Sequence, residues 1–343
     1  MSSFSNLLSG LGWEDDIQQE AVLQVMHFYG CFDETLPSEL ASANEIETLK
    51  ISDTDLFSIN KMMQDHLKRP AGAERQMLSD DPRLKDNSGM HNALIRLYDA
   101  LGMIHELTPP EGEEYDAILV LGSSQPNFQA RLNTLIKVVD EQHVKGTIYL
   151  LGSDRELWPI HEPIVTEFLS ERTGQSVKEL NQYFINYFPQ EIRTIPSVLN
   201  KKRHELIKHF TDTGIKFPTE ADMMYALVDK SILKNYSHVK VEVSKRADGS
   251  RANTEDTIIK FREIYNGTPK KILIISAQPE ALYQVEPVRK IFPYAKIDIA
   301  AEAAKKEVNP LVINDSIARK VYSCLEQQKA EELYSGSQWC PVA

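Results

Sequence analysis

The 343-residue sequence has few cysteines and no long apolar run. Its three cysteines, Cys31, Cys324 and Cys340, are odd in number and far apart, which argues against a disulfide framework or a CxxC metal site. No stretch reaches the roughly 18 apolar residues of a membrane span, and the first residues carry no basic segment. We therefore expect a cytoplasmic protein in a reducing compartment, without a membrane partner.

Positive charge is also in short supply. The chain has 38 basic and 50 acidic residues, a net charge of −12, which argues against nucleic acid as a partner because phosphate binding needs clustered Lys and Arg. The nine histidines form no HExxH motif, so no metal is expected. GxGxxG, GxSxG and GxxxxGK[ST] motifs are absent as well, which weakens dinucleotide, serine hydrolase and P-loop kinase interpretations.

What the sequence does contain is a strand-turn-helix pattern at Tyr115–Arg131. Five consecutive apolar residues end at Gly122, and a helix-like segment follows Ser124. An apolar run without alternation is typical of a parallel strand covered on both faces. Similar patterns occur at 146–156 and 270–281. Since ligands bind beyond the carboxyl ends of parallel strands, these three turns are expected to share one cleft.

The whole pattern predicts an α/β fold: a Rossmann-like, mainly parallel five-stranded sheet with flanking helices, preceded by an all-helical N-terminal region. The helical region is expected at 1–110, the α/β domain at 113–334 with a helical insertion at about 159–211, and a flexible tail at 335–343. Predicted N-terminal helices are Asp15–Tyr29, one capped by Ser52 or Asp53, and Met90–His105. The predicted strands are 116–121, 147–151, 238–243, 271–276 and 296–300.

The first two turns carry candidate ligand-binding residues. Gly122 permits a tight turn, and Ser123 and Ser124 place small hydroxyls where the next helix can present N–H groups to an anion. Arg131 is expected to fold back to a ligand phosphate or carboxylate, although a solvated helical arginine has equal weight. Gly152 and Ser153 offer a similar turn, with an ordinary capped turn as the alternative.

Later segments add carboxylates and amides. Glu220 is the candidate base, or a first-turn acid favoured only by the helix dipole. Asn253, Thr254 and Glu255 open another helix and form either a polar site or a simple cap. Gln278 follows the predicted strand 271–276. The predicted cleft is lined by Ser123, Ser124, Arg131, Ser153, Glu220, Asn253, Glu255 and Gln278.

Taken in order, the segments LGSS, LLGSD, TEADMM, RANTEDT and ILIISAQP resemble the YdcF/SanA-like family of bacterial domains of unknown function, over roughly Asp116–Pro293. The resemblance is to the cytoplasmic YdcF branch, because we expect no membrane anchor in this protein. It implies a Rossmann-type sheet with a polar pocket formed by the glycine turn at Gly122, the turn at Gly152, Glu220, and the Asn253 segment with its acid at Glu255 or Asp256. It also implies S-adenosylmethionine as a ligand.

Three functions follow. The first is a small-molecule binding protein or enzyme with a nucleotide-like or anionic ligand, S-adenosylmethionine among them, at the strand ends. The second is a non-enzymatic scaffold that binds a protein partner through its helical regions. The third is a hydrolase or transferase acting on a phosphorylated or glycosyl substrate, with Glu220, Glu255 or Asp256 as base.

Overall fold

The computed structural model describes residues 3–32, 39–50, 55–70, 73, 78, 81–85, 87–193, 195–246, 252–305 and 307–336. Its centre is a five-stranded sheet of order β3-β2-β1-β4-β5, in which every pair of neighbouring strands is parallel. The predicted α/β fold class is confirmed. The strands are β1 (Glu114–Leu121), β2 (Lys145–Ser153), β3 (His238–Val243), β4 (Lys271–Ala277) and β5 (Lys296–Glu302).

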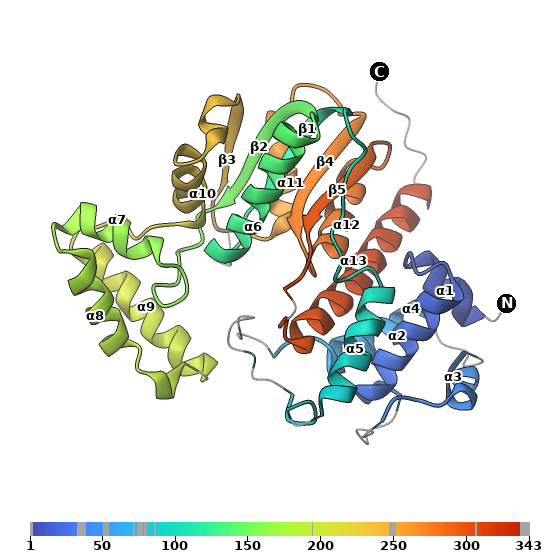
Figure 1. Ribbon diagram of the computed structural model, residues 1–343. Helices are drawn as coiled ribbons and strands as arrows, with labels where there is room; N and C mark the ends of the chain where they lie inside the picture. The colour runs from blue at the N-terminus through green and yellow to red at the C-terminus, as the bar shows by residue number, and fades with distance from the viewer. Residues whose placement is uncertain are drawn as a thin grey trace.

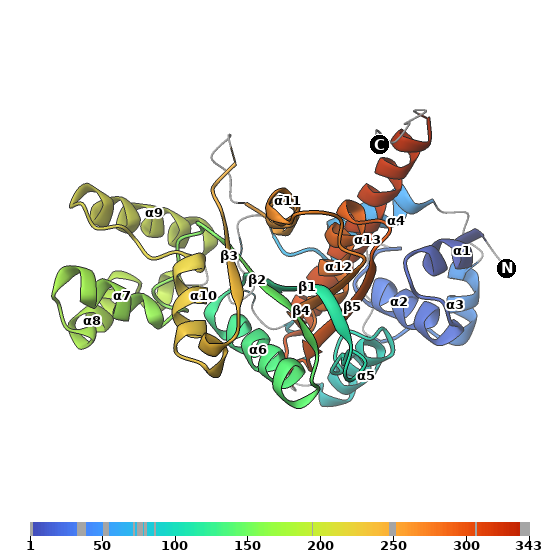
Figure 2. The same cartoon turned by 90° about the horizontal axis from the view of Figure 1, so that it is seen from above.

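Helices cover both faces of the sheet (Figure 2). One face packs against α6 (Gln125–Ile136) and α10 (Glu220–Asp229), and the other against α11 (Thr254–Ile264) and α12 (Ala281–Ile291). The central strand β1 contributes side chains to the core on both faces of the sheet. Ile118 and Val120 are buried on the α6 side, and Leu119 is buried on the α11 side. A strand covered in this way needs apolar side chains at consecutive positions.

The helical insertion lies beside the sheet, at the left of Figure 1. It contains α7 (Ile164–Thr173), α8 (Val177–Tyr187) and α9 (Pro196–Asp212). Buried side chains such as Phe184 and Leu206 join the core on the α6 face of the sheet. The short elements η2 (Lys137–Glu141), η3 (Gln190–Ile192) and η4 (Ile232–Asn235) complete this half of the molecule.

The N-terminal region is helical, but two of its helices were not predicted. These are α1 (Ser3–Gly10) and α3 (Ala43–Lys50). The other three differ slightly from their predicted bounds: α2 (Asp16–Phe28), α4 (Leu56–His66) and α5 (Ser88–Ala100). The N-cap of α4 is Asp55, whose side chain accepts a hydrogen bond from Ser58 N, whereas the predicted caps, Ser52 and Asp53, lie outside the described residues.

The last helix, α13 (Pro310–Gly336), belongs to the same core as the N-terminal helices. Its Ile313, Ile317 and Val321 are buried in one apolar cluster with side chains of α2, α4 and α5. The same helix also packs along α12. It therefore joins the N-terminal region to the sheet. The predicted tail begins within α13, and residues 337–343 lie outside the described part of the chain.

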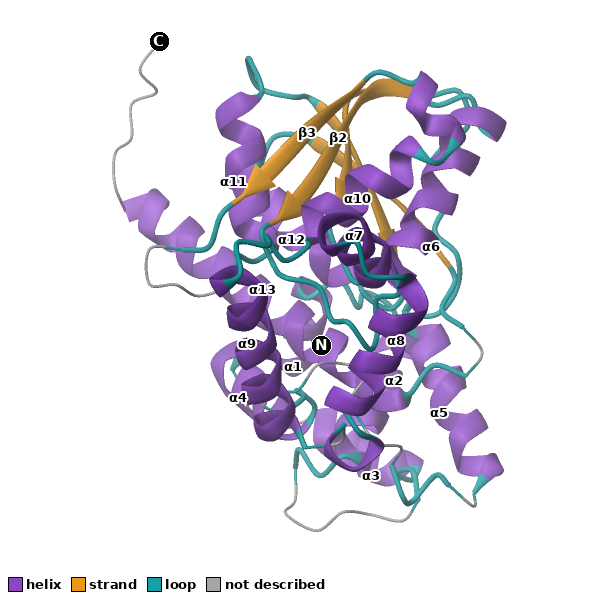
Figure 3. Ribbon diagram, turned by 90° about the vertical axis from the view of Figure 1, so that its left-hand side faces the viewer, coloured by secondary structure: helices purple, strands orange, loops and turns teal. Residues whose placement is uncertain are grey.

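The carboxyl ends of the strands face the two additional helical regions. In Figure 3 the arrowheads of β2 and β3 point toward the side of the molecule that holds the insertion and the N-terminal helices. Both regions therefore flank the sheet edge at which parallel α/β folds bind ligands.

The packing of β2 against α10 depends on a glycine. A Cβ at Gly152 would lie 2.9 Å from Ala221 Cα and 3.0 Å from its Cβ. Gly152→Ala should therefore lower the free energy of unfolding by about 1–3 kcal/mol, the usual cost of overpacking. Urea denaturation measures the change.

Gly89→Ala is the matched control, because the nearest atom to a Cβ there is Asn87 Oδ1 at 3.5 Å, an ordinary contact. This variant should be as stable as the wild type or slightly more so, since alanine favours helix. Equal stability of the two variants would contradict the close approach of α10 to β2.

Candidate functional site

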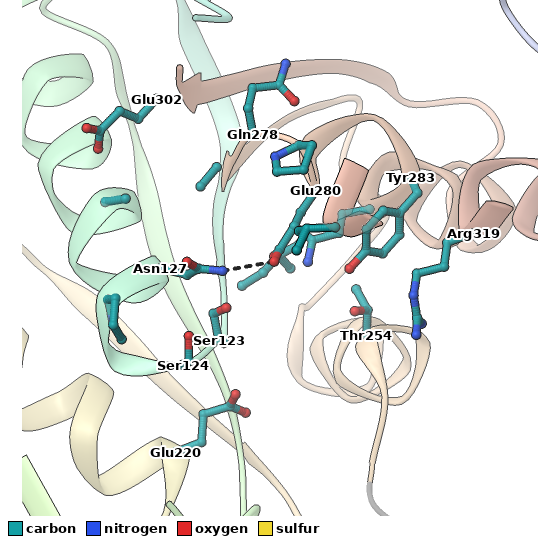
Figure 4. Close-up of a pocket in the computed structure, with 18 of the residues that line it drawn as sticks. Ser123, Ser124, Asn127, Glu220, Thr254, Gln278, Glu280, Tyr283, Glu302 and Arg319 are labelled. Atoms are coloured by element: carbon teal, nitrogen blue, oxygen red, sulfur yellow. Dashed lines mark hydrogen bonds between the residues drawn. The ribbon is translucent and has the colours of Figure 1, made fainter. Parts of the chain in front are cut away.

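A cavity of about 640 Å³ lies at the carboxyl ends of β1, β2 and β4 (Figure 4). From β1 the chain continues to β2 on one side, and the neighbour on the other side is β4, so this is the point at which the strand order reverses. Such a switch point is the usual ligand crevice of open parallel sheets. Eight of the predicted site residues line the cavity: Gly122, Ser123, Ser124, Ser153, Glu220, Asn253, Thr254 and Gln278.

Gly122 is needed for a close approach. Its φ is not positive, so a left-handed backbone angle is not the reason for glycine at this turn. A Cβ at Gly122 would instead lie 2.7 Å from Glu220 Oε2 and 3.0 Å from the Leu151 carbonyl oxygen. Only glycine lets the Glu220 carboxylate, on α10, reach the end of β1.

The turn from β1 into α6 presents backbone N–H groups. Ser124 is the N-cap residue, with φ −66° and ψ 157°, and its hydroxyl makes no capping hydrogen bond. Gln125 N–H donates to Glu162 Oε1 at 3.2 Å. Among the described residues, the N–H groups of Ser123, Ser124 and Asn127 meet no acceptor. Unpaired N–H groups at the N-terminus of a helix favour a bound anion.

Glu220 is the first residue of α10, which Thr219 and Asp222 cap reciprocally. The side chain is buried, with 4% relative exposure. Its Oε2 accepts hydrogen bonds from Ser153 Oγ at 2.5 Å and from Ser153 N at 3.2 Å. These bonds fix the orientation of the Glu220 carboxylate at the wall of the cavity.

Arg155 holds this wall together. Its Nε lies 3.5 Å from Glu220 Oε1, its guanidinium donates to both oxygens of buried Glu162, and it donates to the Ser123 carbonyl oxygen at 3.1 Å. One guanidinium thus joins two carboxylates and the β1–α6 turn. Asp154 and Arg155 stand next to each other in the sequence after Ser153, but nothing in that segment predicts that Glu162 is a partner of Arg155.

Arg131 does not line the cavity. It is fully buried, and its guanidinium donates to the carbonyl oxygens of Leu121 and Gly122 at 2.7 and 2.6 Å. It also donates to Glu280 Oε2 at 2.6 Å and to Gln284 Oε1 at 3.2 Å. The expected contact with a ligand is therefore replaced by an ion pair that ties the end of β1 to the start of α12.

Two more predicted residues lie away from the cavity. Glu255 turns toward α12 and pairs with Lys290 Nζ at 2.7 Å. Gly152 packs against Ala221. Asn253 does line the cavity, but its side chain caps α11 by accepting from Asp256 N at 3.0 Å.

Gln278 also has a structural role. Its Nε2 donates to the Gly102 carbonyl oxygen at 2.8 Å and to that of His105 at 3.2 Å. The turn after β4 is thereby anchored to the segment that follows α5, although Gln278 lines the cavity as predicted.

Several residues that line the cavity were not predicted, chiefly Arg69, Asn127, Tyr283, Lys305 and Arg319. Arg69 follows α4 and Arg319 lies within α13, far from any strand end in the sequence. No spacing rule connects them to the sheet, because only the packing of α13 brings them there. Asn127, by contrast, is close in sequence to the end of β1, because it lies in the first turn of α6. Its Nδ2 donates a hydrogen bond to Glu280 Oε1 at 2.9 Å.

Among the described residues that line the cavity there is neither histidine nor cysteine. Burial raises the pKa of the Cys31 and Cys324 thiols to about 12, which leaves them protonated at neutral pH. Over the described ranges, no three His, Cys, Asp or Glu side chains are grouped to hold a metal ion. In the same ranges no helix has the length and apolar character needed to cross a membrane.

Comparison of the chain with protein-family models, curated proteins and solved structures gave no match. The resemblance to the YdcF/SanA-like family therefore stays a prediction from the sequence motifs.

The buried Arg131–Glu280 pair makes a testable prediction. Arg131→Met should lower the free energy of unfolding by about 3–5 kcal/mol, because it leaves the Glu280 charge buried beside an apolar side chain. The double variant Arg131→Met with Glu280→Gln should be more stable than the single variant, since it removes that charge. Chemical denaturation compares the three proteins.

The control is Lys61→Met, which breaks a pair whose side chains are 69% and 52% exposed. Little change is expected there, because exposed pairs contribute little. If Arg131→Met were as mild as Lys61→Met, the pair would not hold the sheet end together.

Proposed function

We propose that the protein binds a nucleotide-like or anionic small molecule in the cavity at the carboxyl ends of the strands. The observation that carries this proposal is a set of backbone N–H groups at the switch point of the sheet, those of Ser123, Ser124 and Asn127. They have no acceptor among the described residues. Phosphate and carboxylate groups bind readily at such a helix N-terminus. S-adenosylmethionine, which the family resemblance implies, is one candidate ligand.

The size and lining of the cavity support a ligand of this class. Its volume of about 640 Å³ lies within the roughly 300–1,000 Å³ of small-molecule sites. Glu220 is held by Ser153 and Arg155 and turns a carboxylate to the same cavity. A carboxylate accepts hydrogen bonds from hydroxyl or ammonium groups. The ligand favoured by this lining has an anionic part at the β1–α6 turn and a hydroxyl or amine near Glu220.

The test distinguishes the contribution of a backbone N–H group to ligand binding from that of the serine hydroxyl. Ser124 has φ −66°, which proline adopts, so Ser124→Pro removes one N–H group at a compatible backbone angle. Ser124→Ala keeps the N–H and loses only the hydroxyl. We expect a panel of AMP, ADP, ATP and S-adenosylmethionine to contain a ligand that raises Tm, because a ligand at 100 times its Kd stabilises by about 2.7 kcal/mol.

For that ligand, Ser124→Pro should weaken binding by about 1.5–3 kcal/mol, the contribution of a hydrogen bond to a charged group. Ser124→Ala should bind nearly as well as the wild type. Isothermal titration calorimetry measures both. No response to the whole panel, or equal binding by Ser124→Pro, would count against the proposal.

A second candidate is a hydrolase or transferase with Glu220 as base, favoured by the position of this carboxylate in the same cavity as the unpaired N–H groups. With nitrophenyl phosphate and nitrophenyl glycosides as substrates, Glu220→Gln should lower any hydrolysis by roughly 10²–10⁴-fold, the usual contribution of a general base. Glu255→Gln is the matched control, because Glu255 is also a first-turn acid but pairs with Lys290 outside the cavity. Equal loss in both variants, or none in Glu220→Gln, would remove Glu220 as base.

A further inference from the structure

The side of the cavity away from Glu220 is built by the helical regions of the chain. Figure 4 shows Arg319 beside Tyr283 and Thr254, apart from Glu220. The Arg319 guanidinium lies 5.9 Å from the centre of the Tyr283 ring. Arg69 and Lys305 line the same cavity. Three cationic side chains therefore line the same cavity. They come from α13, from the segment after α4 and from the segment after β5.

The two arginines are oriented by one buried carboxylate. Asp315, whose side chain is fully buried, accepts from Arg319 Nε at 2.9 Å and from Arg69 N at 3.3 Å. Arg69 Nε lies 4.0 Å from the same carboxylate. The Arg69 and Arg319 side chains keep 20% and 32% relative exposure. Guanidinium groups held in this way are arranged in advance for carboxylate or phosphate oxygens.

The N-terminus of α11 lines the cavity as well. Asn253 and Asp256 cap this eleven-residue helix reciprocally, which occupies the Asp256 N–H. Within the described part of the chain, the N–H groups of Thr254 and Glu255 meet no acceptor. Thr254 itself lines the cavity. The positive end of the helix dipole and the two arginines thus act on the same region.

We propose that Arg69, Arg319 and the first turn of α11 form a second oxyanion-binding site in the cavity, which we call the arginine site. The inference rests on the proposed function and narrows the ligand class: the ligand carries two separate oxyanion groups, phosphate or carboxylate. One is bound by the N–H groups of the β1–α6 turn, and the other by the arginine site.

The two sites belong to different structural units. The first is formed by the sheet and α6, and the arginine site by α11, α13 and the segment after α4. A ligand with one small oxyanion contacts only one of them, whereas an extended ligand contacts both. Ligand binding therefore links the sheet to the core shared by α13 and the N-terminal helices.

The test compares adenosine 5′-monophosphate with adenosine 3′,5′-bisphosphate, which differ by one separate phosphate. By isothermal titration calorimetry, the wild type should bind the bisphosphate roughly tenfold more tightly, as one added charge-assisted contact provides. Arg319→Gln should abolish this preference. Lys329→Gln removes the same charge from α13 at an exposed position outside the cavity and should keep the full preference.

Thr254→Pro is a second variant that leaves Asp315 and its arginines intact. Proline is favoured at the first position of a helix, and Thr254 N–H has no acceptor there to lose. This variant should reduce the preference several-fold at unchanged Tm. Equal wild-type affinity for the two probes, or a preference that survives in Arg319→Gln, overturns the arginine site alone. Failure of the wild type to bind either probe overturns the arginine site, and the proposed function falls only if the whole ligand panel fails as well.

Discussion

The buried ion pair between Arg131 and Glu280 is the interaction on which the geometry of the cavity depends. Parallel strands bring their carboxyl ends to one edge but leave the last carbonyl groups of each strand without partners. Arg131 donates hydrogen bonds to the carbonyl groups of Leu121 and Gly122. Its ion pair with Glu280 holds the start of α12 beside them. The end of β1 and the start of α12 are therefore held together at the cavity by a buried ion pair.

The same arrangement explains why the sheet was predictable and parts of the site were not. Continuous apolar runs such as Ala117–Leu121 indicate buried parallel strands, because both faces of the sheet are covered. Arg131 and Glu255 have the residue types of a ligand site, but their partners Glu280 and Lys290 lie on α12, far away in sequence. Which charges meet each other depends on tertiary packing that periodicity does not encode.

Ser124 and Ser153, which short turns set close to the strand ends, line the cavity as predicted. Glu220 also lines it, although it arrives on α10, after the helical insertion. Arg69 and Arg319 were missed because they arrive through the packing of whole helices. Helices α1 and α3 were missed as well, since each has only eight residues and its apolar face is too short for a clear period. Local chemistry was predictable, whereas contributions from distant elements required the structure.

The position of α13 also matters for how the chain is made. The helices α2, α4 and α5 leave the ribosome first, yet the core they form includes Ile313 and Ile317 from the last helix. Until the whole sheet has been synthesised, these early helices lack part of the apolar surface that they bury in the finished protein. A nascent chain in this condition exposes hydrophobic side chains, the feature that chaperones bind. The N-terminal helices are thus synthesised before the sheet, but their apolar core is complete only after α13 has been synthesised.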